Sequence, residues 1–283
     1  MDSVRWEDRP KLRRPVLIAA FEGWNDAADA ATTAARYLRD RWGARPFASI
    51  DPEEFYDFSS TRPQVRLTDG LTRQIIWPSN ELSAASLPSE DHDVVVLVGT
   101  EPQLRWRTFC AELVGVATEL EVELVVTVGA LLADVAHTRP VKVTGTAATS
   151  ELVSRLGLHR SRYEGPTGIV GVLHDAFGRA HLPSASLWAA VPHYVAGTPS
   201  PKAALALVDR TAHLLDIPVV TADLAQLAAD YERQVSEVVE SDEDVAAYVS
   251  RLEENNDSAD LELASGEELA AEVQQFLREQ SDG

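Results

Sequence analysis

A continuous run of apolar residues from Val16 to Phe21 constrains the fold of this chain more than any other feature. A strand with one face in water alternates apolar and polar side chains, whereas an unbroken run of this kind is typical of a strand covered on both faces. Gly23 ends the run, and apolar residues then recur with a period near 3.6 as far as Trp42. The segment from Pro15 to Trp42 therefore predicts a strand, a tight turn and a helix.

The same succession of a buried strand and a helix recurs along the chain. Val94 to Val98 ends at Gly99 and precedes a predicted helix from Leu104 to Leu120, and Leu124 to Val128 is a further strand that is expected to end at Gly129. Other predicted elements are strands at Phe47 to Ile50, Val141 to Thr146 and Ser184 to Val191, and helices ending at Leu156, spanning Ile169 to Ala180 and beginning at Ser200-Pro201. This alternation predicts a three-layer α/β/α fold with a mostly parallel sheet.

Two segments between these units lack the pattern of a buried strand. Val65 to Leu67 and Arg73 to Trp77 alternate like an antiparallel hairpin around a turn at Gly70, and we expect this hairpin at an edge of the sheet. Asn80 to Glu90 is rich in polar residues and is predicted to be a loop.

These patterns divide the chain into three regions. We expect residues 1–14 to form an N-terminal extension, residues 15–218 the α/β domain, and residues 219–283 an acidic helical region. In the last region Ser265 and Glu268 form the capping box of a final helix. The apolar stripes of these helices must be buried on something, either the α/β domain or a second copy of the chain.

The charge of the chain is uneven. The net charge is −20 over 283 residues, and residues 221–283 alone contain 18 acidic and 3 basic side chains. Because phosphate contacts need clustered Lys and Arg, nucleic acid is not expected as a partner. The acidic region could face a basic partner, or its charges could simply be solvated helix faces.

The composition also bears on the compartment. No apolar run reaches the roughly 18 residues that suggest a membrane helix, and the first fourteen residues lack the apolar core of a signal peptide. Cys110 is the only cysteine in the sequence, so an intrachain disulfide is excluded. We therefore expect a cytoplasmic protein that does not enter a membrane.

The sequence lacks the usual signatures of cofactor, metal and nucleophile sites. G-x-G-x-x-G and G-x-x-x-x-G-K-[ST] are absent, and Glu22, Asp26 and Asp29 place negative charge at the first helix, where a phosphate would bind. These three carboxylates are instead expected to cap that helix. H-E-x-x-H and G-x-S-x-G are also absent, and one cysteine cannot build a zinc cluster. No catalytic residue, cofactor or metal site is predicted.

Unusual side chains follow three of the predicted strands. Because the carboxyl ends of parallel strands share one rim of a sheet, these side chains could form an acidic and aromatic pocket or contact surface around Glu22, Glu101 and His193. The alternative is a set of turns that carboxylates brace through backbone N–H groups. The residues of this predicted rim are Glu22, Gly23, Trp24, Asn25, Asp26, Gly99, Glu101, Pro102, His137, Arg139, His193 and Tyr194.

Six motifs follow one another between residues 15 and 215. They are Phe21-Glu-Gly-Trp-Asn-Asp-Ala27, Asp51-Pro-Glu-Glu-Phe-Tyr-Asp57, Gly99-Thr-Glu-Pro-Gln-Leu-Arg-Trp106, His137-Thr-Arg-Pro140, Tyr163-Glu-Gly-Pro-Thr-Gly168 and Ser186-Leu-Trp-Ala-Ala-Val-Pro-His-Tyr194. This set resembles the PAC2 family, named for the eukaryotic proteasome assembly chaperone 2, in the branch seen in actinobacteria. The resemblance implies a body similar to the nucleoside phosphorylase fold, self-association with a homotrimer as one option, and, in eukaryotes and archaea, a role in assembling the proteasome core.

The end of the chain departs from the family pattern. Chaperones of this family that dock on the proteasome α-ring do so with a C-terminal hydrophobic-Tyr-any tail, whereas this sequence ends Glu279-Gln-Ser-Asp-Gly283. A contact with proteasome-related proteins is therefore expected to run through the acidic helices. The leading hypothesis is a non-enzymatic, homo-oligomeric assembly chaperone or scaffold. The alternative is a small-molecule sensor or phosphorylase-like enzyme that uses the rim of Glu22, Glu101 and His193.

Overall fold

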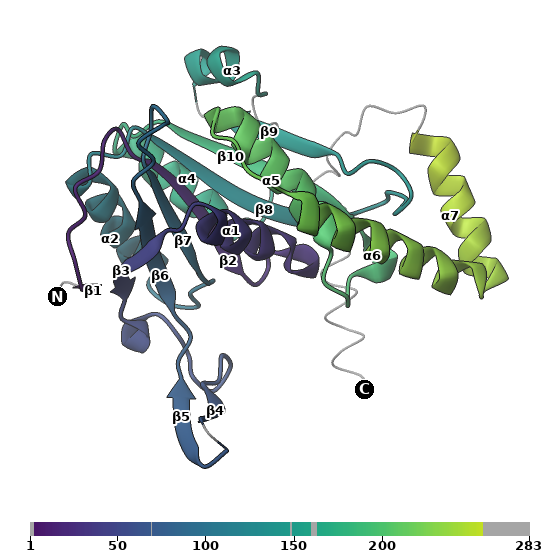
Figure 1. Cartoon of the computed structure of the whole chain (residues 1–283), viewed down its shortest axis with the longest axis horizontal. Coiled ribbons are helices and arrows are strands. Elements are labelled where there is room, and N and C mark those ends of the chain that lie inside the picture. The colour runs from purple at the N-terminus through teal and green to yellow at the C-terminus, as the bar shows by residue number, and fades with distance from the viewer. Residues whose placement is uncertain (1–2, 69, 148, 160–162, 257–283) are drawn as a thin grey trace.

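A computed structural model describes residues 3–68, 70–147, 149–159 and 163–256 of the chain (Figure 1). Within these residues, eight strands form one sheet in the order β1-β3-β6-β7-β2-β8-β10-β9. Its four central strands run parallel: β7 (Val94–Thr100), β2 (Val16–Glu22), β8 (Leu124–Ala133) and β10 (Ser184–Pro192). The predicted α/β fold with a parallel sheet is confirmed at this centre.

Antiparallel strands extend the sheet at both sides. On one side lie β6 (Asn80–Ala85), β3 (Arg45–Ile50) and β1 (Val4–Trp6), and on the other lies β9 (Val143–Ala147). β1 belongs to the segment that was expected to precede the domain.

The prediction of a loop from Asn80 is wrong, because β6 pairs with β7 along its whole length. A polar residue such as Asn80 favours the prediction of a loop. In the structure its side chain is buried and donates a hydrogen bond to the Tyr56 hydroxyl. Ser83 is buried as well.

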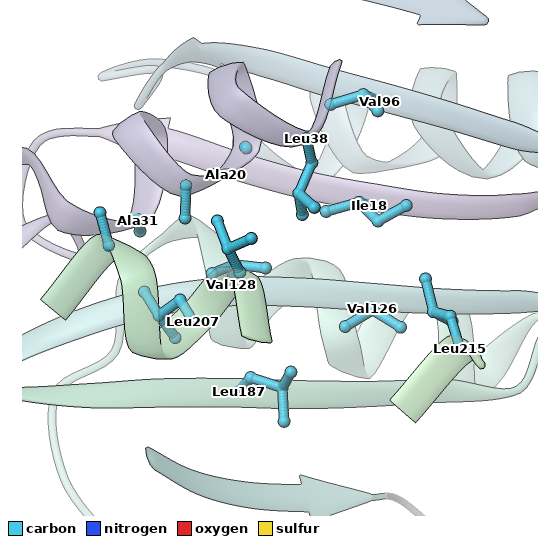
Figure 2. Packing of buried hydrophobic residues seen from close by; sticks show 14 of the residues in the cluster. Ile18, Ala20, Ala31, Leu38, Val96, Val126, Val128, Leu187, Leu207 and Leu215 are labelled. Carbon is cyan, nitrogen blue, oxygen red and sulfur yellow. The ribbon is translucent and has the colours of Figure 1, made fainter. Parts of the chain in front are cut away.

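Helices cover both faces of the sheet, which confirms the three-layer prediction. Side chains from alternate positions of β2 point to opposite faces, as the pleat of a strand requires. Ile18 and Ala20 pack against α1 (Ala30–Arg41) and α5 (Pro201–Leu215). The same cluster contains Leu38 of α1 and Leu207 of α5 (Figure 2). Leu17, Ala19 and Phe21 pack on the other face against α2 (Trp106–Glu119) and α4 (Ile169–Arg179).

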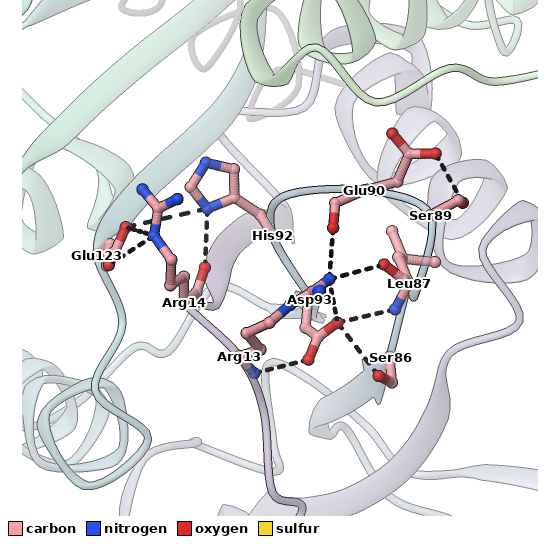
Figure 3. Close-up of polar contacts among 9 residues, drawn as sticks. All are labelled: Arg13, Arg14, Ser86, Leu87, Ser89, Glu90, His92, Asp93 and Glu123. Atoms are coloured by element: carbon pink, nitrogen blue, oxygen red, sulfur yellow. Dashed lines mark hydrogen bonds and ion pairs between the residues drawn. The ribbon is translucent and has the colours of Figure 1, made fainter.

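A buried carboxylate joins the amino ends of the central strands. Asp93 is 2% exposed. Its carboxylate accepts the backbone N–H of Arg13 at 2.6 Å and that of Leu87 at 2.8 Å (Figure 3). It also accepts the Ser86 hydroxyl at 3.2 Å. The Asp93 carbonyl accepts the N–H of Val16. The start of β7 is thereby tied to the start of β2 and to the end of β6.

The predicted hairpin forms, but it does not lie at an edge of the main sheet. β4 (Gln64–Thr68) and β5 (Thr72–Ile76) pair only with each other in the described structure and project from the body (Figure 1). Nearly all of their side chains are exposed.

Gly129 does not end β8, which continues to Ala133. The Trp188 ring of β10 lies against the glycine, so the absence of a side chain allows strand and ring to pack closely. A short helix at the far edge, α3 (Ser150–Leu156), is capped by the Thr149 hydroxyl, which accepts the backbone N–H of Leu152 at 3.2 Å.

The helical region folds onto the α/β body. The helix α6 (Ala222–Glu240) packs along α5 and then forms a small core with α7 (Glu243–Asn256). This core also contains Ala136 from the loop after β8. The predicted helix that begins at Ser265 lies outside the described residues. None of the described helices is long and apolar enough to cross a bilayer.

Candidate functional site

The turn after β2 positions a buried carboxylate at the start of α1. Gly23 has a φ of +123°, which lets the chain turn sharply after the strand. The Asp26 carboxylate then accepts the backbone N–H groups of Ala31 at 2.7 Å and Thr32 at 3.1 Å, and it also accepts the Thr32 hydroxyl. Burial raises the pKa of Asp26 to about 6, although these hydrogen bonds favour the charged form.

The other two carboxylates of this turn do different things. Glu22 forms an ion pair with Arg36 and accepts the Thr100 hydroxyl at 3.2 Å. Asp29 adopts a left-handed conformation with a φ of 52°, and its side chain makes no capping hydrogen bond to the described first turn of α1. The prediction that all three carboxylates cap the helix is correct for Asp26 and wrong for Glu22 and Asp29.

Glu101, just after β7, holds a different helix. Its carboxylate accepts the backbone N–H of Ile169 at 2.7 Å and that of Trp24 at 3.4 Å. The side-chain oxygen of Asn25 accepts the N–H of Val170 at 3.3 Å. Both acceptors therefore satisfy donors in the first turn of α4, and the Glu101 carboxylate also brings negative charge to its positive end. Burial is the main cause that raises the pKa of Glu101.

A separate cluster beneath α6 and α7 contains four other residues of the predicted rim: His137, Arg139, His193 and Tyr194. The Tyr194 hydroxyl accepts the backbone N–H of His137 at 2.8 Å and lies 2.8 Å from Nδ1 of the same residue. His137 Nε2 lies 3.0 Å from the hydroxyl of Ser236, which donates to the Glu232 carbonyl. This chain of donors assigns the neutral Nε2–H tautomer to His137. Burial lowers the pKa of His137 and raises that of Tyr194 to about 12.

A lysine completes the attachment of α6. Lys202 Nζ donates to the carbonyls of His137 and Arg139 and forms an ion pair with Glu232 of α6. Nearby, His193 Nδ1 lies 3.2 Å from a carboxylate oxygen of Asp134, and the His193 ring meets Tyr248 of α7 edge to face. These contacts join the body to the helical region.

Strand register explains why His193 is not beside Glu22 and Glu101. Glu101 donates its backbone N–H to the Glu22 carbonyl, so these two residues are adjacent. Ala19 of β2 is level with Thr127 of β8, which is level with Ser186 of β10. Glu22 lies three residues beyond this level and His193 seven, a difference of roughly 13 Å along the strands.

Two adjoining hollows open where β2 and β7 end. The first has a volume of about 450 Å³ and lies between α1 and the hairpin, and the second has a volume of about 400 Å³ and reaches Trp106. Glu22, Thr61 and Thr100 line both. Residues of the predicted rim that line one or both hollows are Glu22, Gly23, Gly99, Glu101 and Pro102.

The sequence reading missed the basic side chains of the first hollow. These side chains are Arg36, Arg39, Arg62 and Arg66. The sequence did hold a signal for two of them. Arg36 and Arg39 of α1 have an i, i+3 spacing, which places both on one helical face. No group of three His, Cys, Asp or Glu side chains converges as a metal site in the part of the chain that the structure describes.

A family model described as the PAC2 family matches residues 20–239, which include every residue that lines the two hollows. The chain belongs to the PAC2 family. The matched region extends through α6 almost to its end.

Solved structures of other PAC2 proteins have the same fold. A PAC2 family protein from Streptomyces avermitilis is 47% identical, with a TM-score of 0.78, and the match covers 83% of this chain and 99% of that one. Rv2125 of Mycobacterium tuberculosis, described as a proteasome-assembly chaperone homologue, is 48% identical, with a TM-score of 0.76 and the same coverage of 83% and 99%.

A more distant structure shares the fold alone. PbaB of Pyrococcus furiosus, described as an archaeal proteasome activator, is 18% identical with a TM-score of 0.66, over 84% of this chain and 99% of that one. No protein with a curated description matches the sequence significantly.

Proposed function

We propose that this PAC2 protein is an assembly chaperone or scaffold for proteasome subunits and works through protein–protein contacts. The observation that carries the proposal is the 48% identity to a relative described as a proteasome-assembly chaperone homologue, over 99% of that relative. The proposal places the protein in the cytoplasm as a homo-oligomer.

The use of the strand-end polar groups supports a binding role. Asp26, Asn25 and Glu101 accept backbone N–H groups of α1 and α4, and His137 is enclosed beneath α6. Each of these groups therefore already stabilises the fold. A general acid or base must instead reach a substrate proton.

The projecting hairpin supplies a contact surface for a proteasome subunit. Because side chains alternate along a strand, Val65, Leu67 and Ile75 share the hairpin face that points away from the first hollow. They are 57%, 58% and 48% exposed. A two-stranded hairpin is marginally stable in water on its own, so burial of this face against a partner would stabilise it. Arg73 lies on the same face, which suits a partner surface that is apolar with acidic groups.

Reconstitution of the proteasome core tests the proposal. Purified α and β subunits would be mixed with the full chain at physiological salt, and core assembly followed on native gels. We expect faster assembly with the wild type and with Thr72→Asp, which lies on the other hairpin face, but not with Leu67→Asp. A parallel variant, Leu227→Asp on the exposed side of α6, tests whether the contact runs through the acidic helices. The absence of both binding and any effect on assembly would contradict the proposal.

The oligomeric state has its own test. Light scattering on a size-exclusion column should give the mass of two or more chains, each of 30.9 kDa. A monomer at micromolar concentration would refute self-association.

A further inference from the structure

The first hollow is a basic groove in an acidic chain. Its lining contains four arginines, Arg36, Arg39, Arg62 and Arg66, and two glutamates, Glu22 and Glu81, so the formal charge of these six side chains is +2. The whole chain has a net charge of −20. A local positive charge against such a background attracts anions to this groove rather than to the rest of the surface.

The two glutamates are already engaged with the two arginines of α1. Glu22 forms an ion pair with Arg36, and Glu81 lies 3.7 Å from Arg39, which also pairs with Asp40. Among the residues that the structure describes, Arg62 and Arg66 lie within ion-pair distance of no carboxylate. Two guanidinium groups in the groove are therefore available to an anion.

The groove lies where an α/β sheet forms a crevice. β2 and β7 are adjacent and parallel, and the groove is lined by Glu22 and Thr100, the last residues of these strands. From β2 the chain continues into α1 on one face of the sheet, and from β7 into α2 on the other. Ligands of open α/β sheets bind in the crevice at such a point, outside the carboxyl ends of the strands.

The rest of the lining limits the class of ligand. Hydroxyl groups of Thr61 and Ser79 can donate hydrogen bonds, while Ile76 and Trp77 form an apolar wall. The volume of about 450 Å³ lies in the range of small-molecule sites. The planar guanidinium group matches carboxylate and phosphate oxygens with two parallel hydrogen bonds.

We propose that this groove binds a small organic anion with two or more negative oxyanion charges and an apolar portion. The anion contacts Arg62 and Arg66, and the apolar portion lies against Trp77. A phosphate ester and a polycarboxylate share this chemistry. The proposal does not depend on the assembly role, because anion binding is measured on the purified chain without proteasome subunits.

The acidic turn does not oppose such a ligand. Glu22, Asp26 and Asp29 suggest repulsion of a phosphate when the sequence is read alone. In the structure Arg36 pairs with Glu22, and the carboxylate of Asp26 points to the first turn of α1. The exposed Asp29 is not among the residues that line the groove. The anion also contacts the arginine side chains of the groove rather than the start of the helix.

Titration calorimetry on the full chain tests the proposal with three anions and one neutral probe. Pyrophosphate and adenosine monophosphate represent phosphates, citrate represents polycarboxylates, and adenosine carries no charge. The variants are Arg62→Gln and Arg66→Gln. Arg73→Gln is the matched control, because Arg73 lies in the same hairpin as Arg66 but on its opposite face. All three positions are exposed, so the variants are expected to fold.

We expect at least one anion to bind the wild type and Arg73→Gln equally, and to bind Arg62→Gln and Arg66→Gln at least tenfold more weakly. Binding should weaken as salt rises, and adenosine should not bind. Preference for citrate or for the phosphates identifies the source of the oxyanion. The proposal is overturned if no anion binds at millimolar concentration, or if binding is unchanged in Arg62→Gln and Arg66→Gln.

Discussion

The Glu101 carboxylate accepts a 2.7 Å hydrogen bond from the backbone N–H of Ile169, which lies 68 residues further along the chain. This contact joins the end of β7 to the first turn of α4. Gly168, the residue before Ile169, leaves no room for a side chain, because an added Cβ would lie 2.7 Å from a carboxylate oxygen of Glu101. The strand end and the helix start are therefore fitted to each other.

Glu101→Ala should destabilise the fold by about 1–3 kcal/mol, because it removes a charged acceptor from partly buried donors. Glu101→Gln keeps an acceptor oxygen, so its effect should be smaller. Urea unfolding of both variants measures the difference. Equal stability of Glu101→Ala and the wild type would mean that the contact does not hold α4.

Asp26 should make stability depend on pH between about 4 and 7. Burial raises its folded pKa to about 6, whereas an unfolded Asp titrates near 3.9. The folded state therefore holds a proton more tightly in this window, so the contribution of Asp26 is greatest below about pH 4 and is lost as the pH rises through 6. A shift of this size corresponds to at most roughly 3 kcal/mol.

Urea unfolding of the wild type and Asp26→Asn at several pH values measures this contribution. The stability of the wild type relative to Asp26→Asn should fall as the pH rises from 4 to 7. Asp57→Asn is the control, because the pKa of exposed Asp57 is lowered by hydrogen bonds from Ser59, which moves its titration below this window. A wild-type curve parallel to that of Asp26→Asn would contradict the prediction.

Acidification should loosen α6 and α7 before it loosens the sheet. Burial, with the charge of Lys202, lowers the pKa of His137. Since an unfolded histidine gains a proton near pH 6.5, the neutral buried ring contributes stability that is fully present above that pH and is lost as the pH falls from there through the lower folded pKa. Glu232 and Glu253 face the same ring and oppose the shift.

Hydrogen exchange at pH 7.5 and pH 5.5, corrected for intrinsic rates, follows this loosening. We expect protection of α6 and α7 to decrease at pH 5.5 relative to α1. His137→Gln, which cannot titrate, should show no such pH dependence. His174, whose pKa burial also lowers, lies on α4, so its effect is distinguished by location. Equal loss of protection in α1 and α6 would count against a role for His137.

The central strands can be read from the sequence because burial on both faces leaves a continuous apolar run. Two strands with such a run are β2, which contains Val16 to Phe21, and β7, which contains Val94 to Val98. β6 could not be read in the same way, because the side-chain N–H of its buried Asn80 donates to Tyr56, a partner 24 residues away. Local patterns do not reveal such a partner.

The candidate site was predictable to the extent that it depends on strand ends. Glu22 and Glu101 meet because β2 and β7 are parallel neighbours. The position of His193 depends on the lengths of β8 and β10. β8 continues past Gly129, and β10 continues beside it to Pro192. The basic groove depends on where the hairpin with Arg66 projects, and no spacing along the chain determines this.

Gly129→Ala should destabilise the protein, because the site has no room for a methyl group. A Cβ at Gly129 would lie 2.6 Å from the Trp188 ring, and that ring is held by a 3.0 Å hydrogen bond from its Nε1 to the Ser186 hydroxyl. Overpacking of this kind typically costs about 1–3 kcal/mol. Gly115→Ala in α2 is the matched control, since a Cβ there meets nothing within 4 Å and alanine favours a helix by about 0.5–1 kcal/mol. Urea unfolding should therefore move the two midpoints in opposite directions, and a stabilising Gly129→Ala would show that Trp188 can move away from β8.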